Sequence, residues 1–128
     1  MSLDLKYLVW SVLLTLAQCI IAVTGAMVQV GLPALTGNRE NLPPITGWAG
    51  RAARAHRNIL ESLILFTALV LVARVTGTAN ATTALGSEVF FWARVVYIPI
   101  FLIGIPWART GVWAISIVGL VMIITQVV

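Results

Sequence analysis

Residues 7–38 read YLVWSVLLTLAQCIIAVTGAMVQVGLPALTGN and contain no charged residue over 32 consecutive positions. The hydrocarbon core of a bilayer is about 30 Å thick, and a helix needs roughly 20 apolar residues to cross it. The stretch therefore predicts a membrane-spanning helix, which we place at residues 5–32. We do not expect it to be a cleavable signal peptide, because it is too long and lacks both a basic lead-in and a clear cleavage site.

Composition places the whole chain in the membrane class. Of its 128 residues, 60% are hydrophobic and 9% are charged, whereas about a quarter of the residues in a soluble domain are charged. Disorder is excluded for the same reason, because disordered chains are polar and rich in charge. One cysteine, Cys19, excludes an internal disulfide and a cysteine-based zinc site, and we expect no bound metal.

Three further spans follow from the turn signals. Proline, glycine and polar residues mark turns at residues 36–44, 76–80 and 104–106, which leaves helices at 46–75, 82–104 and 108–128. Pro99 should kink the third helix, because proline leaves the carbonyl of Val95 without its helical donor. The expected fold is an all-α integral membrane protein, one domain over residues 1–128, with four transmembrane helices in an up-down bundle.

The basic residues predict the orientation in the membrane. The side of the first and third connectors holds Arg39, Arg51, Arg54 and Arg109, and the opposite side holds Lys6 and Arg74. Cytoplasmic segments carry the excess of basic residues. We therefore expect both termini outside and the two connectors in the cytoplasm, with Arg39 and Arg74 acting as interfacial anchors.

The second predicted helix carries charges where a membrane span usually has none. Four of its polar residues recur at steps of three and four and so share a face: Arg51, Arg54, Asn58 and Glu61. Counted from Trp48, Arg57 lies about 14 Å and Glu61 about 20 Å along the helix. Charges at that depth cost several kcal/mol unless they are paired or hydrated, and they mark functional interiors.

Arg94 of the third predicted helix is the expected partner of Glu61. It precedes Pro106 by twelve residues, and so lies roughly 18 Å from the same side of the membrane. We expect the two side chains to pair directly or within hydrogen-bond reach. The alternative role of such a pair is purely structural, because a buried ion pair can fix helix register without taking part in chemistry.

Basic and aromatic residues should meet at the cytoplasmic side. Arg94, Tyr97 and Phe101 share a helix face, and Arg109, Thr110 and Trp113 follow the last turn. With the polar face of the second helix they would form a pocket for a small peptide-like anion with more than one carboxylate, because guanidinium groups bind carboxylates bidentately. The net charge of +4 fits this basic site better than nucleic acid, because the chain has no basic run.

Two residues near this face have simpler interpretations. A contact with lipid headgroups explains Arg51 equally well, because long basic side chains extend to the membrane surface. His56 points about 140° away from the Arg51 face on ideal helix geometry, which favours a contact between helices over catalysis.

The motif RAHRNILE at residues 54–61, followed by Phe66, resembles the second-helix signature of the MAPEG proteins, the membrane-associated proteins of eicosanoid and glutathione metabolism. Arg94-Val95-Val96-Tyr97 and Arg109-Thr110 are similar to the third- and fourth-helix segments of that family, particularly in its small bacterial members. The resemblance implies a homotrimer in the bacterial inner membrane, with glutathione held between subunits near the cytoplasmic side.

The resemblance also implies roles for individual residues. By motif position, the candidate glutathione-binding residues are Arg54, Arg57, Asn58, Glu61, Arg94, Tyr97, Phe101 and Trp113, and the candidate catalytic residues are Arg109 and Thr110. Arg51 is a further candidate glutathione-binding residue because it lies on the polar face of the second predicted helix. Arg109 matches the arginine proposed to stabilise the glutathione thiolate. Phe101 and Trp113 stand where some members have tyrosine. The first helix offers only Gln18 and Gln29 where several members have a basic residue.

The expected activity is that of a membrane-bound glutathione-dependent transferase or peroxidase acting on lipophilic electrophiles. A free thiol has a pKa of about 8.5, and a neighbouring guanidinium favours its thiolate. One alternative is a non-catalytic, lipid-binding scaffold of the same family. Another is a small multidrug transporter, although the first helix lacks the membrane-embedded glutamate of such transporters and the arginines would repel cationic drugs.

Overall fold

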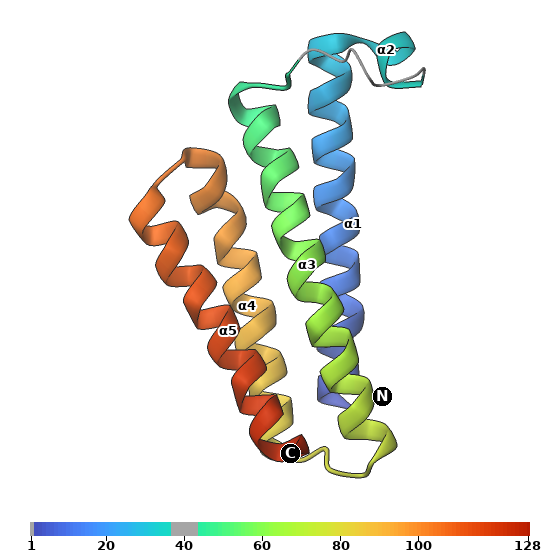
Figure 1. Cartoon of the computed structure of the whole chain (residues 1–128), viewed down its shortest axis with the longest axis vertical. Coiled ribbons are helices and arrows are strands. Elements are labelled where there is room, and N and C mark those ends of the chain that lie inside the picture. The colour runs from blue at the N-terminus through green and yellow to red at the C-terminus, as the bar shows by residue number, and fades with distance from the viewer. Residues whose placement is uncertain (1, 37–43) are drawn as a thin grey trace.

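The computed structural model describes residues 2–36 and 44–128, and its described part is built from helices. Four of them are long and apolar enough to cross a membrane: α1 (Leu3–Val30), α3 (Gly47–Val75), α4 (Ala81–Ile103) and α5 (Pro106–Val127). Successive long helices run in opposite directions, so the two chain termini lie at the same end of the bundle (Figure 1). This confirms the predicted four-helix, all-α membrane fold. The predicted anchor Arg39 lies outside the described residues.

Glycines end two of the long helices. Gly31 adopts φ 84°, so α1 ends at Val30, two residues before the predicted end. A short helix that the sequence did not predict, α2 (Leu32–Thr36), follows it; proline is tolerated in the first turn of a helix, so Pro33 does not prevent it. Gly104 has φ 86° and ends α4, which continues through Pro99 without a break in the helix.

α1 and α3 are tied together at both ends. At one end, the buried Asp4 carboxylate accepts hydrogen bonds from Nε and Nη2 of Arg74, at 3.1 and 2.5 Å. At the other end, Gln29 bonds both backbone groups of Thr46, the N-cap residue of α3, at 3.0 and 2.6 Å. Thr46 is the N-cap residue, as predicted, but its side chain makes no cap hydrogen bond; Gln29 of α1 bonds its backbone.

α4 and α5 touch backbone to backbone. A Cβ atom placed on either Gly86 or Gly119 would lie 2.6 Å from the carbonyl oxygen of the other glycine, closer than real Cβ atoms approach an oxygen. Small residues at helix crossings of this kind let membrane helices approach closely enough for extensive van der Waals contact.

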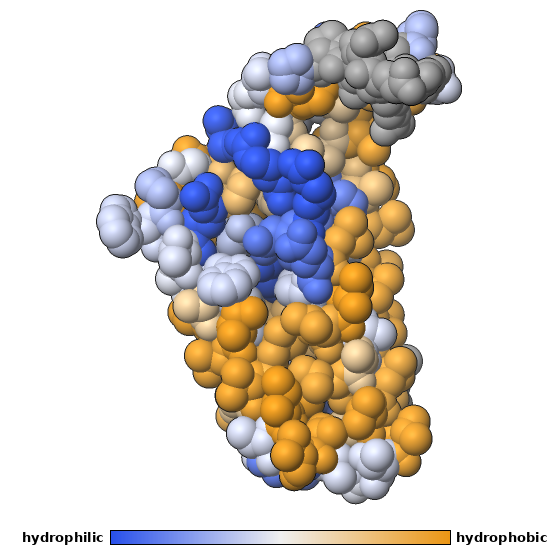
Figure 2. Space-filling view, in the orientation of Figure 1, coloured by the Kyte–Doolittle hydropathy of each residue, from blue (hydrophilic) through white to orange (hydrophobic). Residues whose placement is uncertain are grey.

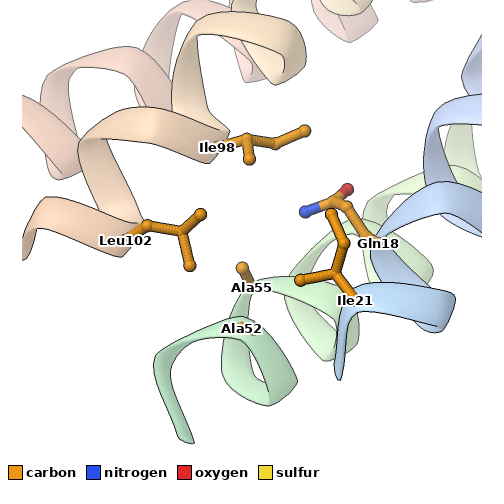
Figure 3. Close-up of a pocket in the computed structure, with 6 residues that line it drawn as sticks. All are labelled: Gln18, Ile21, Ala52, Ala55, Ile98 and Leu102. Carbon is orange, nitrogen blue, oxygen red and sulfur yellow. The ribbon is translucent and has the colours of Figure 1, made fainter. Parts of the chain in front are cut away.

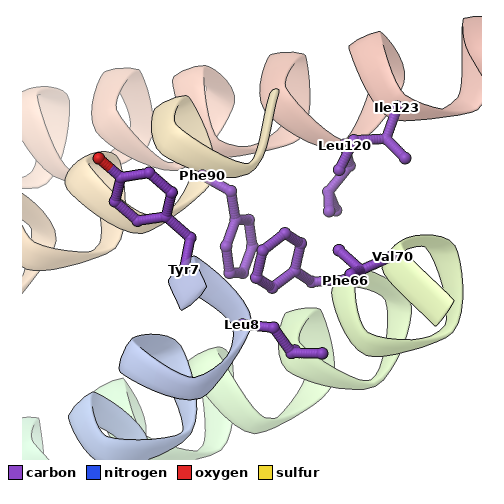
Figure 4. Packing of buried hydrophobic residues seen from close by; sticks show 7 residues of the cluster. All are labelled: Tyr7, Leu8, Phe66, Val70, Phe90, Leu120 and Ile123. Atoms are coloured by element: carbon purple, nitrogen blue, oxygen red, sulfur yellow. The ribbon is translucent and has the colours of Figure 1, made fainter. Parts of the chain in front are cut away.

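The main apolar core lies in the half of the bundle nearer the termini. It is formed by Tyr7, Leu8, Phe66, Val70, Phe90, Leu120 and Ile123, which come from all four long helices (Figure 4). The rings of Phe66 and Phe90 stack at its centre with their centroids 4.3 Å apart. The other half of the bundle, where α3 and α5 begin, holds a smaller buried cluster of Ala55, Tyr97 and Phe101.

Candidate functional site

Hydrophilic surface gathers at the end of the bundle where α3 and α5 begin, while most of the face below it is hydrophobic (Figure 2). Arg54 and Arg57 are exposed there on α3, and Arg109 is half-buried in the first turn of α5. The start of a helix carries a partial positive charge. Two helix starts and several arginines therefore make this end of the molecule strongly attractive to anions.

An open cleft of about 170 Å³ lies among three helices at this end. Its lining residues are Asn58 of α3, Tyr97 of α4, and Arg109, Thr110 and Trp113 of α5. All five are candidate site residues from the sequence. The up-down fold brings them together, because the first turns of α3 and α5 and the last turns of α4 lie at the same end of the bundle.

Two arginines and two aromatic rings contact one another in a row that leads from the interior to this cleft. The Arg94 guanidinium carbon lies 4.2 Å from the Tyr97 ring centroid, and the Tyr97 and Phe101 centroids are 5.3 Å apart. The Arg109 guanidinium carbon lies 5.1 Å from the Phe101 centroid. Guanidinium groups are attracted to ring faces at these distances. Phe101 thus supports Arg109 from below, although it does not line the cleft.

Arg94 is a buried cation without a hydrogen-bonding partner. Its side chain is 1% exposed, and none of its three guanidinium nitrogens meets an acceptor among the described residues. The predicted pairing with Glu61 is therefore wrong within the chain. Glu61 is exposed because it lies about 100° around α3 from Ser62, which belongs to the buried stripe of that helix. Glu61 and Arg94 lie at similar depths along their helices, but their side chains do not face each other.

The remaining arginines of α3 take two different positions. Arg51 is half-buried, and its Nε donates a hydrogen bond to the Leu102 carbonyl oxygen at 2.9 Å. Arg54 and Arg57 are exposed and do not line the cleft. The structure therefore brings together only part of the predicted set within one chain.

Two lining groups have free hydrogen-bonding capacity. The Oδ1 atom of Asn58 is buried and has no partner among the described residues. The Thr110 hydroxyl donates to the Pro106 carbonyl oxygen at 3.1 Å, so its oxygen is left to accept a hydrogen bond from a ligand.

The polar residues of α1 do not reach the cleft. Gln18 is buried, and its amide points into a separate cavity of about 10 Å³ between α1, α3 and α4 (Figure 3). That volume holds about one water molecule, and the Gln18 Oε1 atom has no protein partner in the described part of the chain. His56 is half-buried, with a buried Nδ1 that likewise has no partner there.

The bond between Asp4 and Arg74 was missed at the sequence level, where Arg74 was predicted to be an interfacial anchor. A signal for it was available. In an up-down bundle the start of the first span and the end of the second lie at the same membrane surface, and these two residues have opposite charges at those positions.

The fold and the cleft together define an integral membrane protein of four spanning helices with an aromatic-edged cleft, lined by one arginine, at its basic end. The sequence profile of the MAPEG family matches residues 5–128, nearly the whole chain, and the chain belongs to this family. Its members are glutathione-related transferases, peroxidases or proteins of lipid metabolism. Comparisons with curated proteins and with solved structures find no significant match.

Proposed function

We propose that the protein is a membrane-bound, glutathione-dependent transferase or peroxidase that acts on lipophilic electrophiles. The observation that carries the proposal is the cleft, in which Asn58, Arg109 and Thr110 converge with two aromatic residues from three helices. Family membership supports the same activity.

The residues present fit glutathione, which offers two carboxylates, an ammonium group, two amide bonds and a thiol. Arg109 provides a cationic donor in the cleft, and Arg94 provides a second positive charge behind the lining residue Tyr97. Asn58 Oδ1, which has no partner among the described residues, accepts from N–H groups. These are the groups that a zwitterionic peptide with excess negative charge requires.

The size of the cleft supports assembly into the proposed homotrimer. Its volume of about 170 Å³ is smaller than the roughly 300 Å³ at which pockets for drug-sized ligands begin. Arg54, Arg57 and Glu61 are exposed on α3 outside the cleft, where they would contact a ligand bound between two copies of the chain. We infer that a neighbouring subunit completes the site.

Arg109 is the proposed catalytic residue. When bound, glutathione supplies the sulfur nucleophile, so the protein needs none of its own. The Arg109 guanidinium holds the negative charge of the thiolate and so increases the fraction that is ionised at neutral pH. The Thr110 hydroxyl oxygen, beside Arg109, accepts a hydrogen bond from glutathione. Trp113, which is 41% exposed, lies at the edge of the cleft where a lipophilic electrophile enters from the bilayer.

The proposed orientation places this site at the cytoplasmic face of a bacterial inner membrane, with both termini outside. The more basic end of the bundle is the one retained on the cytoplasmic side. Fusion of alkaline phosphatase to the C-terminus should give an active, translocated reporter, while a fluorescent protein fused there should stay dark. The reverse pattern would contradict this orientation.

A non-catalytic, lipid-binding scaffold is the second candidate. It is favoured by Phe101 and Trp113, which offer no hydroxyl group beside Arg109. A multidrug transporter gains no support from the cleft, because the one charged residue that lines it in the described part of the chain is Arg109, which would repel a cationic drug.

Calorimetry on the detergent-solubilised protein tests the proposal. Glutathione should bind with a dissociation constant in the millimolar range or below, and the same preparation should conjugate a lipophilic aryl halide or reduce a lipid hydroperoxide. Binding without turnover would favour the scaffold. Absence of any binding at millimolar glutathione would overturn the proposal.

A further inference from the structure

The turn between α4 and α5 leaves backbone carbonyl groups of α4 without their usual donors. The N–H groups of Gly104 and Ile105 both donate to the Ile100 carbonyl oxygen, at 3.0 and 3.3 Å. In a continuing helix the Leu102 carbonyl would receive the N–H of residue 106, but that residue is Pro106, which has none. The final carbonyls of a helix need partners from outside it.

Arg51 of α3 provides the partner for Leu102. Its Nε donates to the Leu102 carbonyl oxygen at 2.9 Å, between residues 51 positions apart in the sequence. Its Cδ lies 3.8 Å from the position that a Cβ on Gly104 would occupy, so the side chain packs along the turn itself. One donor of this arginine is therefore used by the backbone of a neighbouring helix.

The bond between Arg51 and Leu102 fixes the turn between α4 and α5. Two groups that contact Arg109, the Phe101 ring and the Ile105 carbonyl, lie at this turn. Phe101, whose ring lies beneath Arg109, immediately precedes Leu102. On the other side of the turn, the Arg109 N–H donates to the Ile105 carbonyl oxygen at 3.1 Å. Asn58, which faces Arg109 across the cleft, lies on α3 two helical turns beyond Arg51. A shift of the turn relative to α3 would change the width of the cleft at the reacting end.

We propose that Arg51 is a positioning residue, which sets the place of Arg109 relative to Asn58 through its bond to Leu102 and makes no direct contact with glutathione. The proposal rests on the proposed function and assigns Arg51 a role different from direct glutathione binding, for which its place on the polar face of the second helix made it a candidate.

Two substitutions separate the hydrogen bond from the charge. Arg51→Gln places its amide nitrogen at the same position along the side chain as Nε, so it keeps the donor and loses the charge. Arg51→Met has a side chain as long as that of Arg51→Gln and loses both the donor and the charge. We expect Arg51→Met to weaken glutathione binding about tenfold, the usual effect of one lost hydrogen bond, and Arg51→Gln to stay within about twofold of the wild type.

Two further measurements locate the effect. Arg51→Met should raise the pH at which bound glutathione forms its thiolate, followed by ultraviolet absorbance, because Arg109 is displaced. It should also speed hydrogen exchange at residues 103–109, which requires no ligand. Arg51→Gln should leave both readouts near those of the wild type.

Equal weakening by both variants would show that Arg51 acts through its charge and would overturn the proposal, as would wild-type behaviour of Arg51→Met. If Arg51→Met does not fold, a tenfold loss in Arg51→Gln still overturns it, and wild-type affinity in Arg51→Gln supports it. If the wild type binds no glutathione, the proposed function fails, while the exchange comparison still decides whether Arg51 holds the turn.

Discussion

The two ends of the bundle treat their charges in opposite ways. At the end with the termini, the buried carboxylate of Asp4 accepts hydrogen bonds from Nε and Nη2 of Arg74, from the hydroxyl of Ser2 at 2.7 Å and from the backbone N–H of Leu5 at 3.0 Å. At the other end, Arg94 is 1% exposed and its guanidinium has no hydrogen-bonding partner among the described residues. A buried charge that is hydrogen-bonded within the fold stabilises the fold, whereas a buried charge without such a partner is available for the ligand of the proposed site.

The same contrast separates the two kinds of interior. The half that holds Phe66 and Phe90 is closed by stacked rings from all four long helices. The half that holds the cleft uses its rings as supports for cations, with Tyr97 beneath Arg94 and Phe101 beneath Arg109. Aromatic residues therefore build the core in one region and position charge in the other.

The largest expected effect comes from Arg109. Arg109→Met should lower turnover by roughly 10²–10³-fold, the cost of removing one donor that stabilises developing negative charge, while the melting temperature in detergent changes little. Steady-state kinetics with a lipophilic electrophile provide the measurement. Arg109→Lys, which keeps a cation, should lose less. Turnover within a few-fold of the wild type in Arg109→Met would show that this arginine does not hold the thiolate.

Arg94 should show opposite effects on stability and binding. Arg94→Met should raise the free energy of unfolding by about 1–4 kcal/mol, because a buried cation without a partner is replaced by an apolar chain of similar length. Glutathione affinity should fall roughly tenfold or more through the loss of charged hydrogen bonds. Thermal unfolding and calorimetry measure the two effects. A destabilised variant would mean that Arg94 has a structural partner.

The same substitution at the other end is the matched control. Arg74→Met should lower the free energy of unfolding by about 1–3 kcal/mol, because it leaves the buried Asp4 without its partner. Glutathione affinity should not change, since Arg74 lies 20 positions along α3 from Arg54, about 30 Å away. If Arg74→Met and Arg94→Met shifted the melting temperature in the same direction, the contrast between the two ends would not hold.

The smallest expected effect concerns Phe101. Phe101→Leu removes the ring beneath Arg109 and should weaken thiolate formation about threefold to fivefold, as expected for a cation–π contact near 1 kcal/mol. Phe101→Tyr retains the ring and should stay close to the wild type. The absorbance of bound thiolate as a function of pH measures both. A larger loss in Phe101→Tyr than in Phe101→Leu would show that the ring face is not what supports Arg109.

Much of the fold followed from the sequence because apolar length is a strong signal. All four spans were predicted, with every end within two residues of the observed one. The short helix α2 was not predicted, because Gly31 and Pro33 read as the start of a connector. The bonds of Gln29 to Thr46 were missed as well, because they depend on how two helices are rotated against each other.

The same limit applied at the site. The five residues that line the cleft were predicted from the sequence, because similar depth and helix order place them at one end of the bundle. Arg94 was paired with Glu61, which depth alone cannot justify, and the bond of Arg51 to the backbone of α4 was not predicted. Helix periodicity gives the face on which a side chain lies, but packing decides what that face meets.

The contact between Gly86 and Gly119 has a consequence for genetics. Neither position tolerates even a methyl group without displacement of a backbone carbonyl, so a screen of random variants for loss of activity should score both as essential. They lie in the half of the bundle away from the cleft and touch no candidate ligand. A map of mutational sensitivity would therefore highlight the proposed site and this helix crossing, and sensitivity at the crossing would report on packing alone.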